Sequence, residues 1–591
     1  MSDNPEVNSF LYFSKIMEKI SQISGRLEIT DILSSYYSSI ISKKKDDLIY
    51  VLYLCTHTIY PEYQNQQLNL GEKIIFDVLK ESTGKTTQHL KSEYCKTGDF
   101  GTIGMTYRIK RLFISKKTLG VKDVVEGLRN ISEINGVKSR TSKMRKMLDL
   151  ISLCSPIEVK FMFRLFEENL KIKFRPKTVL TALAKVFDDS YMDKIKEAYN
   201  RRPDLEQLTK VILEKGISSL DSDFDIVPGI PLKPMLAQPT KNISSAFKRV
   251  ENHKFTCENK YDGERIQIHR HNKKMTLYSR NLENTSDKYS DVIIKSNTDK
   301  DFVIDGEVVA YDPNLKKILS FQKLSTRRRK DFSKGEGVNI CVFVFDILFF
   351  DGKELINKTL EERREVLYRE FSEVEGQFYF SEHINCENIE EIDEFFKMSC
   401  SGNYEGIMIK ILGEGSNYIP SLRCNSWIKL KKDYIDNASD SFDLVVIGAY
   451  YGKGKRTGWY GGFLLASYNE EDEIFETVCK IGTGFDDSTL NKLYEELNNF
   501  VVSTPSSVRY KDQTKPDVWI SPKFVWEVKA AAVSVSPIYC CGLYEDKGYS
   551  LRFPRFLKER EDKKATDATT SNQIIMNYKE YEQEGKAGEE I

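Results

Sequence analysis

One lysine stands among carboxylates, in the stretch TCENKYDGER at residues 256–265. The residues before Lys260 are aromatic and β-branched, and Asp262-Gly263 is a turn signal, so we predict that Lys260 ends a strand and faces a cleft. Lysine attacks phosphorus or carbonyl carbon only as the free amine, and at its ordinary pKa roughly one molecule in 2,000 is free at neutral pH. We therefore expect burial and nearby cations to lower the pKa of Lys260.

Strands further along the chain could complete a site around this lysine. Taken alone, Lys260 could also be a surface lysine beside a hairpin turn. We predict two strands about a turn within 302–310, a buried strand at 341–348, and strands at 405–410 and 427–432. They carry Glu307, Phe345, Glu405, Lys410, Lys429 and Lys431. Each residue alone has a structural explanation: a core ring, a turn residue, or lysines on a solvated edge strand. Together they suit nucleotidyl transfer, because a ring stacks on a purine, paired carboxylates hold Mg²⁺ and lysines neutralise an α-phosphate.

The composition describes an ordinary soluble chain that holds several domains. Its 591 residues are enough for three or four domains, with 40% hydrophobic and 30% charged residues. Eleven cysteines without a Cys-x-x-Cys pair, and six histidines without zinc-ligand spacing, predict reduced thiols in a cytosolic or nuclear protein and oxygen ligands for any metal. No apolar stretch has the length of a membrane helix, and Met1–Glu6 has no signal or transit character.

The first 225 residues differ from the rest in charge and in periodicity. They hold 36 Lys+Arg against 30 Asp+Glu, so their net charge is +6, and the remaining residues carry −6 because the whole chain is neutral. Two runs, at 108–117 and 138–146, hold five cations each without an acid. Either run could bind phosphates, or form a solvated helix face. Apolar residues recur at helical steps within 159–166 and 179–187, and Asp, Pro and Gly at 221–231 mark a linker.

Six motifs in order resemble the ATP-dependent DNA ligases of the covalent nucleotidyltransferase superfamily. They are KYDGER at 260–265, SRN at 279–281, DGE at 305–307, VFD at 344–346, EGIMIK at 405–410 and WIKLKKDY at 427–434. Later motifs resemble the carboxy-terminal domain of the replicative ligase I branch, namely GAYYGKGKR at 448–456, YGGFLLA at 460–466, KIGTGF at 480–485 and SLRFPRF at 550–556. GDFG at 98–101 and the helices near 160–190 resemble the family's helical DNA-binding domain.

This resemblance implies a multidomain fold. It predicts an all-α DNA-binding domain at 1–225, an α+β nucleotidyltransferase (adenylation) domain at 226–433, an all-β OB-fold domain at 434–565 and a C-terminal tail at 566–591.

The resemblance also implies a three-step reaction with ATP and Mg²⁺. Lys260 attacks the α-phosphate of ATP and becomes lysyl-AMP, AMP passes to the 5′-phosphate of a nick, and the 3′-hydroxyl then displaces AMP. Residues expected to bind the cofactor are Glu258 at adenine, Phe345 stacked on it, Arg265 and Glu307 at ribose and phosphate, Lys410, Lys429 and Lys431 at the phosphates, Arg423, and Trp427 behind the strand. Glu307 and Glu405 would hold the metal. Arg280 would take the nick phosphate, and Arg560 and Lys563 would orient pyrophosphate. Phe321 and Phe553 would press on the minor groove, with Arg552 and Arg555 beside them on DNA.

One position departs from the family pattern. Ligase I sequences carry a glutamate seven residues after the first glycine of Gly-Asp-x-Gly, and it helps to hold Mg²⁺ against the DNA near the nick. Here that position is Met105, a soft ligand, while its partner is present as Glu283. We predict that this metal site is weakened and that mismatched 3′ ends are sealed more easily.

Other functions stay as alternatives. A capping guanylyltransferase or an RNA ligase shares the lysine chemistry but lacks the long helical domain, and an inactive DNA-binding scaffold would not need the lysine and carboxylates. An NAD⁺-dependent ligase would need a four-cysteine zinc site, which has no counterpart here. The expected partner is nicked double-stranded DNA, bound by a monomer with no membrane association. No sliding-clamp peptide is recognisable at the amino end. Arg327–Lys330 fits DNA contact better than a nuclear signal, so nuclear localisation rests on the resemblance alone.

Overall fold

The computed structural model describes residues 6–587 apart from 110–117, 241, 293–294, 297–298, 326, 328–336, 403, 433–440, 506 and 545. Most residues up to Leu430 form one compact unit, and most residues from Lys431 onward form a second. Two predicted basic segments, 108–117 and 327–330, lie largely outside the described residues. Among the residues that are described, no helix is long and apolar enough to cross a membrane.

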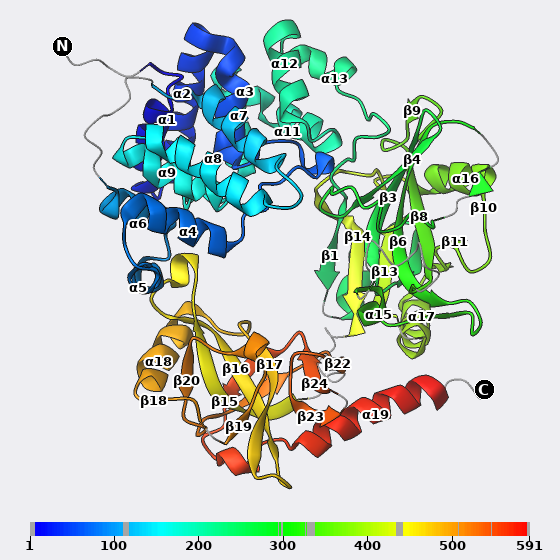
Figure 1. Ribbon diagram of the computed structural model, residues 1–591. Helices are drawn as coiled ribbons and strands as arrows, with labels where there is room; N and C mark the ends of the chain where they lie inside the picture. Colours follow the sequence, from blue (N-terminus) through cyan, green and yellow to red (C-terminus); the bar gives the residue numbers. More distant parts are fainter. Residues whose placement is uncertain are drawn as a thin grey trace. The chain divides into compact units, whose positions relative to one another are not determined.

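The described residues before the first strand form a bundle of helices, drawn in blue through cyan to blue-green in Figure 1. The helices are α1 Phe10–Ser21, α2 Arg26–Lys44, α3 Leu48–Thr56, α4 Glu72–Thr83, α5 Thr87–Thr97, α6 Phe100–Tyr107, α7 Val121–Ser132, α8 Ser139–Leu153, α9 Pro156–Phe166, α10 Pro176–Phe187, α11 Met192–Arg201, α12 Leu205–Lys215 and α13 Leu220–Asp223. The helical periods at 159–166 and 179–187 fall in α9 and α10, so these predictions are confirmed.

The GDFG motif joins α6 to α9. The Asp99 carboxylate caps α6 by accepting from the Gly101 N–H at 3.0 Å, and it also pairs with the buried Arg164 of α9. A Cβ on Gly101 would lie 2.3 Å from the Lys160 carbonyl oxygen, so glycine permits the close contact of the two helices. The motif is therefore a packing device of the helical domain.

The part of the chain from β1 to β14 is built on two sheets. The five-stranded sheet has the order β1-β14-β13-β2-β12, and β11-β8-β6-β3-β4 is the path of the seven-stranded sheet, with β7 and β9 paired beside it. The first contains β1 Leu236–Thr240, β2 Phe255–Lys260, β12 His383–Cys386, β13 Gly406–Ile411 and β14 Arg423–Lys431. The second contains β3 Glu264–His271, β4 Lys274–Ser279, β6 Phe302–Asp312, β7 Lys317–Ile318, β8 Ile340–Phe350, β9 Lys353–Glu354 and β11 Phe378–Phe380. Also present are the pair β5 Lys295–Ser296 and β10 Phe371–Ser372, and the helices α14 Ile243–Phe247, α15 Phe321–Ser325, α16 Leu360–Glu370 and α17 Ile389–Ser401.

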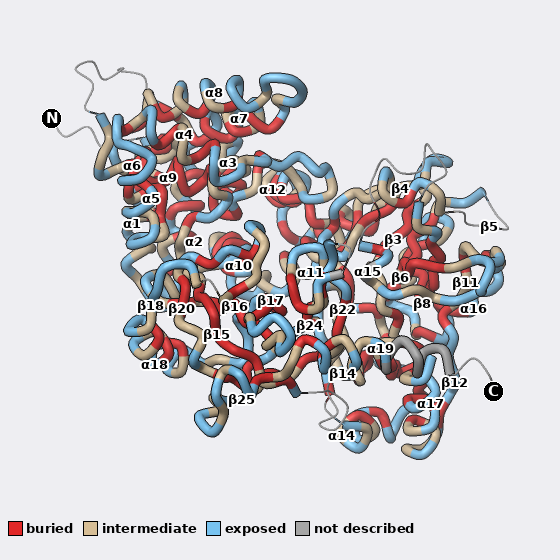
Figure 2. Tube along the Cα trace, turned by 60° about the horizontal axis from the view of Figure 1, so that its bottom comes forward, coloured by how far each residue is buried: buried red, intermediate tan, exposed pale blue. Residues whose placement is uncertain are grey.

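Residues 302–312 form one strand, β6, and not the two strands predicted about Asp305-Gly306. The register with β8 shifts between these two residues, so the irregularity is a bulge within a continuous strand. A Cβ on Gly306 would lie 2.8 Å from the Phe343 carbonyl oxygen. Glycine is therefore required here by the close approach of the neighbouring strand, and not by a turn. β6 and β8 are buried along almost their whole length (Figure 2).

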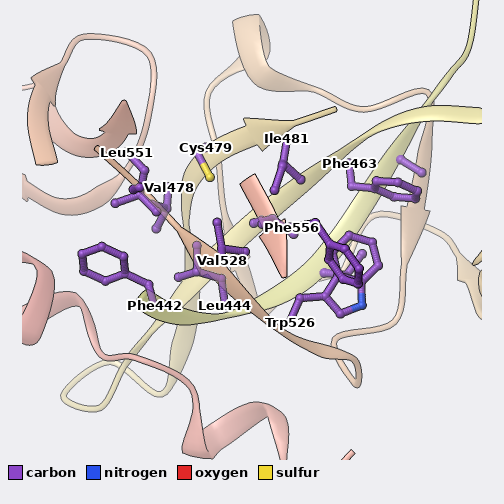
Figure 3. Close-up of a cluster of buried hydrophobic side chains, with 14 of the residues drawn as sticks. Phe442, Leu444, Phe463, Val478, Cys479, Ile481, Trp526, Val528, Leu551 and Phe556 are labelled. Carbon is purple, nitrogen blue, oxygen red and sulfur yellow. The ribbon is translucent and has the colours of Figure 1, made fainter. Parts of the chain in front are cut away.

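The described residues from 441 onward form a β-rich domain with two α-helices. Its elements are β15 Ser441–Tyr451, β16 Tyr460–Asn469, β17 Ile474–Ile481, α18 Asp487–Asn498, β18 Val501–Val502, β19 Val508–Arg509, β20 Val518–Ile520, β21 Val525–Lys529, β22 Ala532–Ser536, β23 Cys541–Tyr544, β24 Lys547–Arg552, β25 Arg555–Glu559 and α19 Ser571–Ala587. Side chains from β15, β16, β17, β21, β24 and β25 meet in one apolar core around Phe463 and Trp526 (Figure 3). Residues 566–591, predicted to be a tail, contain α19, whose Ile574 is fully buried in this core. The domain is therefore β-rich, and α19 packs into its core.

Candidate nucleotidyl-transfer site

The turn after β2 fixes Lys260 where the five-stranded and seven-stranded sheets join. Only residues 261–263 separate β2, in the five-stranded sheet, from β3, in the seven-stranded sheet. Tyr261 is buried and stacks on Phe343 with ring centroids 4.2 Å apart. A Cβ on Gly263 would lie 2.2 Å from the Val308 carbonyl oxygen, so this turn requires glycine. Lys260 is the last residue of β2, which confirms its predicted place at a strand end.

Carboxylates surround the Lys260 ammonium. It forms a salt bridge with Glu405, whose backbone N–H also donates to the Lys260 carbonyl oxygen at 2.9 Å. Burial lowers the pKa of Lys260, but Glu405 and Glu307 outweigh burial and leave that pKa raised. The prediction of a lowered pKa is wrong for this arrangement, because carboxylates and not cations act on the amine. A raised pKa favours the protonated form of the Lys260 amine, which cannot attack.

Glu307 is the second carboxylate beside the lysine. It lies on β6 opposite Arg265 of β3. Burial, with Glu405 and Asp305 adding to it, raises the pKa of Glu307 to about 7 against the opposing effects of Lys260 and Arg265. Within the described part of the chain, no cluster of three or more His, Cys, Asp or Glu could hold a metal ion. Glu307 and Glu405 offer the oxygen donors that Mg²⁺ prefers, so the pair fits this ion if phosphate oxygens complete its ligands.

Arg265 is anchored by protein groups. Its guanidinium makes two hydrogen bonds to the buried Asp305, at 3.1 and 2.7 Å. A third goes to the Met235 carbonyl oxygen at 2.6 Å and a fourth to the Tyr418 hydroxyl at 3.2 Å. The guanidinium is thus oriented by the protein before any nucleotide binds.

Two aromatic rings and a lysine form the other end of the site. Phe345 and Trp427 meet edge to face, with centroids 5.9 Å apart, and the Lys410 ammonium lies 4.3 Å from each centroid. Lys410 donates to Glu258 at 2.7 Å, and Glu258 also bonds Arg364 of α16. Burial raises the pKa of Glu258, but Lys410 and Arg364 outweigh burial and leave it lowered, so Glu258 is a buried anion. The structure therefore places Lys410 against the two rings and Glu258.

The strand β14 carries the remaining predicted lysines. Trp427, Lys429 and Lys431 alternate along it and share one face, with the two lysines half-buried. Arg423 begins the strand, is exposed, and donates to the Ala237 carbonyl oxygen at 3.3 Å.

Comparison with known proteins agrees with this geometry. The family models for the DNA ligase N terminus, the ATP dependent DNA ligase domain and the ATP dependent DNA ligase C terminal region match residues 9–184, 234–431 and 456–563. DNA ligase 1 of Saccharomyces cerevisiae is 41% identical over an alignment of 611 positions, which covers 98% of this chain and 81% of that protein. DNA ligase 1 of Schizosaccharomyces pombe is 39% identical over 98% of this chain and 80% of its own length. This chain belongs to the ATP-dependent DNA ligases of the DNA ligase 1 type.

The ligase uses ATP to seal nicks in DNA through an adenylate intermediate. A DNA ligase of the archaeon Saccharolobus islandicus is also similar, at 34% identity over 96% of this chain and 97% of that protein. A solved structure titled "Pmar-Lig_Pre." shares the fold with a TM-score of 0.56 at 16% identity, covering 93% of this chain and 99% of that one. The predicted fold class is confirmed, with a helical domain, an adenylation domain and a β-rich OB-fold region.

In the β-rich domain of the ligase, the two predicted pyrophosphate cations are held by acids. Arg560 binds Asp443 through two hydrogen bonds of 3.1 Å and also pairs with Asp562. Lys563 donates to the same Asp443 at 2.6 Å.

The predicted DNA-contacting residues lie in different surroundings. Phe553 is 69% exposed at the β24–β25 turn, with a left-handed φ of 50° that is strained for an aromatic residue. The half-buried Arg552 lies with its guanidinium 5.2 Å from the Phe553 ring, and Arg555 is exposed. Phe321, by contrast, is half-buried against the core of the adenylation domain.

Arg280 and Glu283 are exposed in the turn that follows β4. The basic run at 138–146 lies in α8 and its N-cap, where Lys143 is buried and donates to the Leu68 carbonyl oxygen at 2.7 Å. This lysine is therefore structural, while Lys138, Arg145 and Lys146 stay exposed. Arg327 is also buried and pairs with Asp291, and the other residues of its basic run, 328–330, lie outside the described residues.

Sequence reasoning missed several residues that hold the site. Asp305 orients Arg265, and the adjacent arginines Arg363 and Arg364 bind Asp346 and Glu258. In the β-rich domain, Asp443 binds Arg560 and Lys563. The paired arginines at the start of an amphipathic helix were the one available signal, but such pairs usually form solvated helix faces.

Proposed function

We propose that Lys260 is the nucleophile of the adenylation step. The ammonium first releases one proton to solvent and becomes the free amine. Its nitrogen then forms a bond to the α-phosphorus of ATP as the bond to pyrophosphate breaks, and the nitrogen releases a second proton to leave the phosphoramidate N–H of lysyl-AMP. The observation that carries this proposal is the position of Lys260, at the end of β2 with Glu405 and Glu307 beside it and the aromatic pair at the other end of the site.

The nucleotide would lie across this site. Phe345 would stack on adenine, with Glu258 and Lys410 at its edge, and the preoriented Arg265 would meet the sugar and phosphates together with Glu307. Lys429 and Lys431 share the face of Trp427 and would line the phosphates, with Arg423 at the start of the same strand. Fixed cations of this kind stabilise charge that grows on phosphate oxygens.

Glu307 and Glu405 would hold Mg²⁺, and Glu283 would hold a second ion near the nick. When bound, Mg²⁺ supplies Lewis-acid stabilisation of phosphoryl oxygens. The task of the two carboxylates is to fix the ion next to Lys260 with oxygen ligands.

The DNA-facing residues extend the proposal to the other domains. Arg280 would take the nick phosphate, and Phe321 and Phe553 would press on the minor groove beside Arg552 and Arg555. Arg560 and Lys563 would orient pyrophosphate in the first step. The proposed domains are 1–225, 226–433 and 434–565, with α19 attached to the last. The ligase would act as a monomer in the nucleus, in replication and repair, by analogy with its eukaryotic relatives.

Two lysine variants test whether Lys260 is the nucleophile. Lys260→Ala should form no labelled adduct with ATP and yet seal a nick that already carries AMP, because only the first two steps use the amine. Lys254→Ala removes an exposed lysine just before β2 and should behave as the unsubstituted ligase. A labelled adduct on the Lys260→Ala protein would contradict the assignment.

A further inference from the structure

Glu258, Lys410 and Arg364 form a buried cluster with more positive than negative charge. The side chains of Glu258 and Lys410 are each 2% exposed, and that of Arg364 is 5% exposed. Lys410 alone would neutralise Glu258. A second buried cation is unfavourable unless its charge is balanced and its N–H groups are hydrogen-bonded. Neutralising Glu258 therefore does not by itself explain why Arg364 is buried here.

The two adjacent arginines of α16 differ in how their N–H groups are used. Arg363 makes two hydrogen bonds to Asp346 and further bonds to the carbonyl oxygens of Lys358 and Ser416. Arg364 makes one bond, to Glu258, and its buried Nε and second terminal nitrogen have no hydrogen-bond partner in the part of the chain that the structure describes. Buried donors are nearly always paired, so these two point to an acceptor on a ligand.

The position of the cluster identifies that ligand. Glu258 lies two residues before Lys260 and on the same face of β2. Its other partner, Lys410, covers the rings of Phe345 and Trp427. On the far side of Glu258, His383 of β12 is its direct strand neighbour and stacks with Tyr368, four residues after Arg364 on α16. These contacts place the Arg364 side chain next to Glu258, at the end of the site that we assign to the purine.

Purine chemistry matches a carboxylate next to a guanidinium. Adenine offers an amino donor at C6 beside an acceptor nitrogen at N1. A carboxylate accepts from the first group and a guanidinium donates to the second. A 6-oxopurine reverses this pattern, because it has an acceptor oxygen at C6 and a donor at N1.

We propose that Arg364 is a positioning and specificity-determining residue for the nucleotide base: it fixes the Glu258 carboxylate and donates from its remaining N–H groups to the base. The site then accepts 6-aminopurine triphosphates and rejects 6-oxopurine triphosphates. This inference rests on the proposed nucleotide site around Lys260.

The test compares self-adenylation of the full chain with ATP and with inosine triphosphate, whose base carries oxygen at C6. Arg364→Met removes the guanidinium and keeps an apolar chain of similar length. Its KM for ATP should rise roughly tenfold or more, while its use of inosine triphosphate changes little, so that the preference for ATP falls by about tenfold. Arg364→Lys keeps the charge but has fewer N–H donors. Its preference for ATP should lie between that of Arg364→Met and that of the unsubstituted ligase. Arg369→Met, on the same helix with its side chain 63% exposed, should match the unsubstituted ligase.

The preference ratio is measured within one preparation, so a partly unfolded variant does not alter it. A ratio within about twofold of the unsubstituted ligase, or an equal loss with both nucleotides, would overturn the role of Arg364. If the unsubstituted ligase formed no ATP adduct at Lys260, the proposed site would fail and this inference with it. A normal adduct with an unchanged ratio would contradict Arg364 alone.

Discussion

The buried ion pair next to Phe345 should couple two substitutions strongly. Asp346 and Arg363 are both fully buried, and their two hydrogen bonds measure 2.6 and 2.8 Å. Asp346→Leu leaves a buried guanidinium without its counter-ion, which should cost about 3–5 kcal/mol of unfolding free energy in the adenylation domain. Arg363→Met leaves a buried carboxylate, and the cost should be of the same size.

The double variant should lose less unfolding free energy than the sum of the two single losses. It removes both charges and leaves the carbonyl oxygens of Lys358 and Ser416 without the Arg363 donor, at about 1–3 kcal/mol each. The sum of the single losses is about 6–10 kcal/mol and the double loss about 2–6 kcal/mol, so the coupling free energy should be about 4 kcal/mol.

The assay is a urea titration in which self-adenylation with labelled ATP reports folding of the adenylation domain. Lys300→Met is the control, because it breaks an exposed pair with Asp351 whose side chains are 52% and 50% exposed. This variant should lose less than about 1 kcal/mol. Single losses that add up in the double variant would refute the argument, because additive effects mean that the two side chains do not stabilise each other.

Three further results are expected. First, burial lowers the pKa of His269 to about 3. The unfolded chain, with a histidine pKa of about 6.5, therefore takes up the proton first, so stability should fall by about 2 kcal/mol from pH 7 to pH 5 through this residue. His269→Gln should remove that part of the loss in the same urea titration at the two pH values, and an unchanged difference would contradict a neutral buried histidine. Second, deletion of residues 1–225 should leave self-adenylation largely intact while it weakens nick binding and flattens its salt dependence, since fewer phosphate contacts release counterions. An unchanged salt slope would exclude a DNA-binding role. Third, Met105→Glu should raise discrimination against mismatched 3′ ends by up to roughly tenfold across a Mg²⁺ titration. If only Glu283→Ala changed discrimination, another residue would be the missing ligand.

Much of the architecture follows from patterns in the sequence. Lys260 ends β2 because an apolar strand meets an Asp-Gly turn, and the alternation around Trp427 puts Lys429 and Lys431 on its face of β14. These are local signals, set by side-chain period and backbone freedom. The same local reasoning failed at Asp305-Gly306. The glycine is needed there because the carbonyl oxygen of Phe343, on the neighbouring strand, leaves no room for a side chain.

The electrostatics of the site depend on partners far away in the chain. The raised pKa of Lys260 comes from Glu405 and Glu307, and the orientation of Arg265 comes from Asp305, 40 residues away. Arg364 reaches Glu258 across 106 residues. Periodicity and spacing in the sequence do not predict these long-range contacts, because they arise from the topology of the two sheets.

The most direct test of the central claim is the position of the covalent adduct. The purified ligase is incubated with ATP and Mg²⁺, then digested, and the peptides are sequenced by mass spectrometry. The account predicts AMP on Lys260 and on no other lysine, no adduct with GTP, and loss of the adduct when a nick with a 5′-phosphate is added. AMP on another lysine, or an adduct that persists in the presence of nicked DNA, would contradict it.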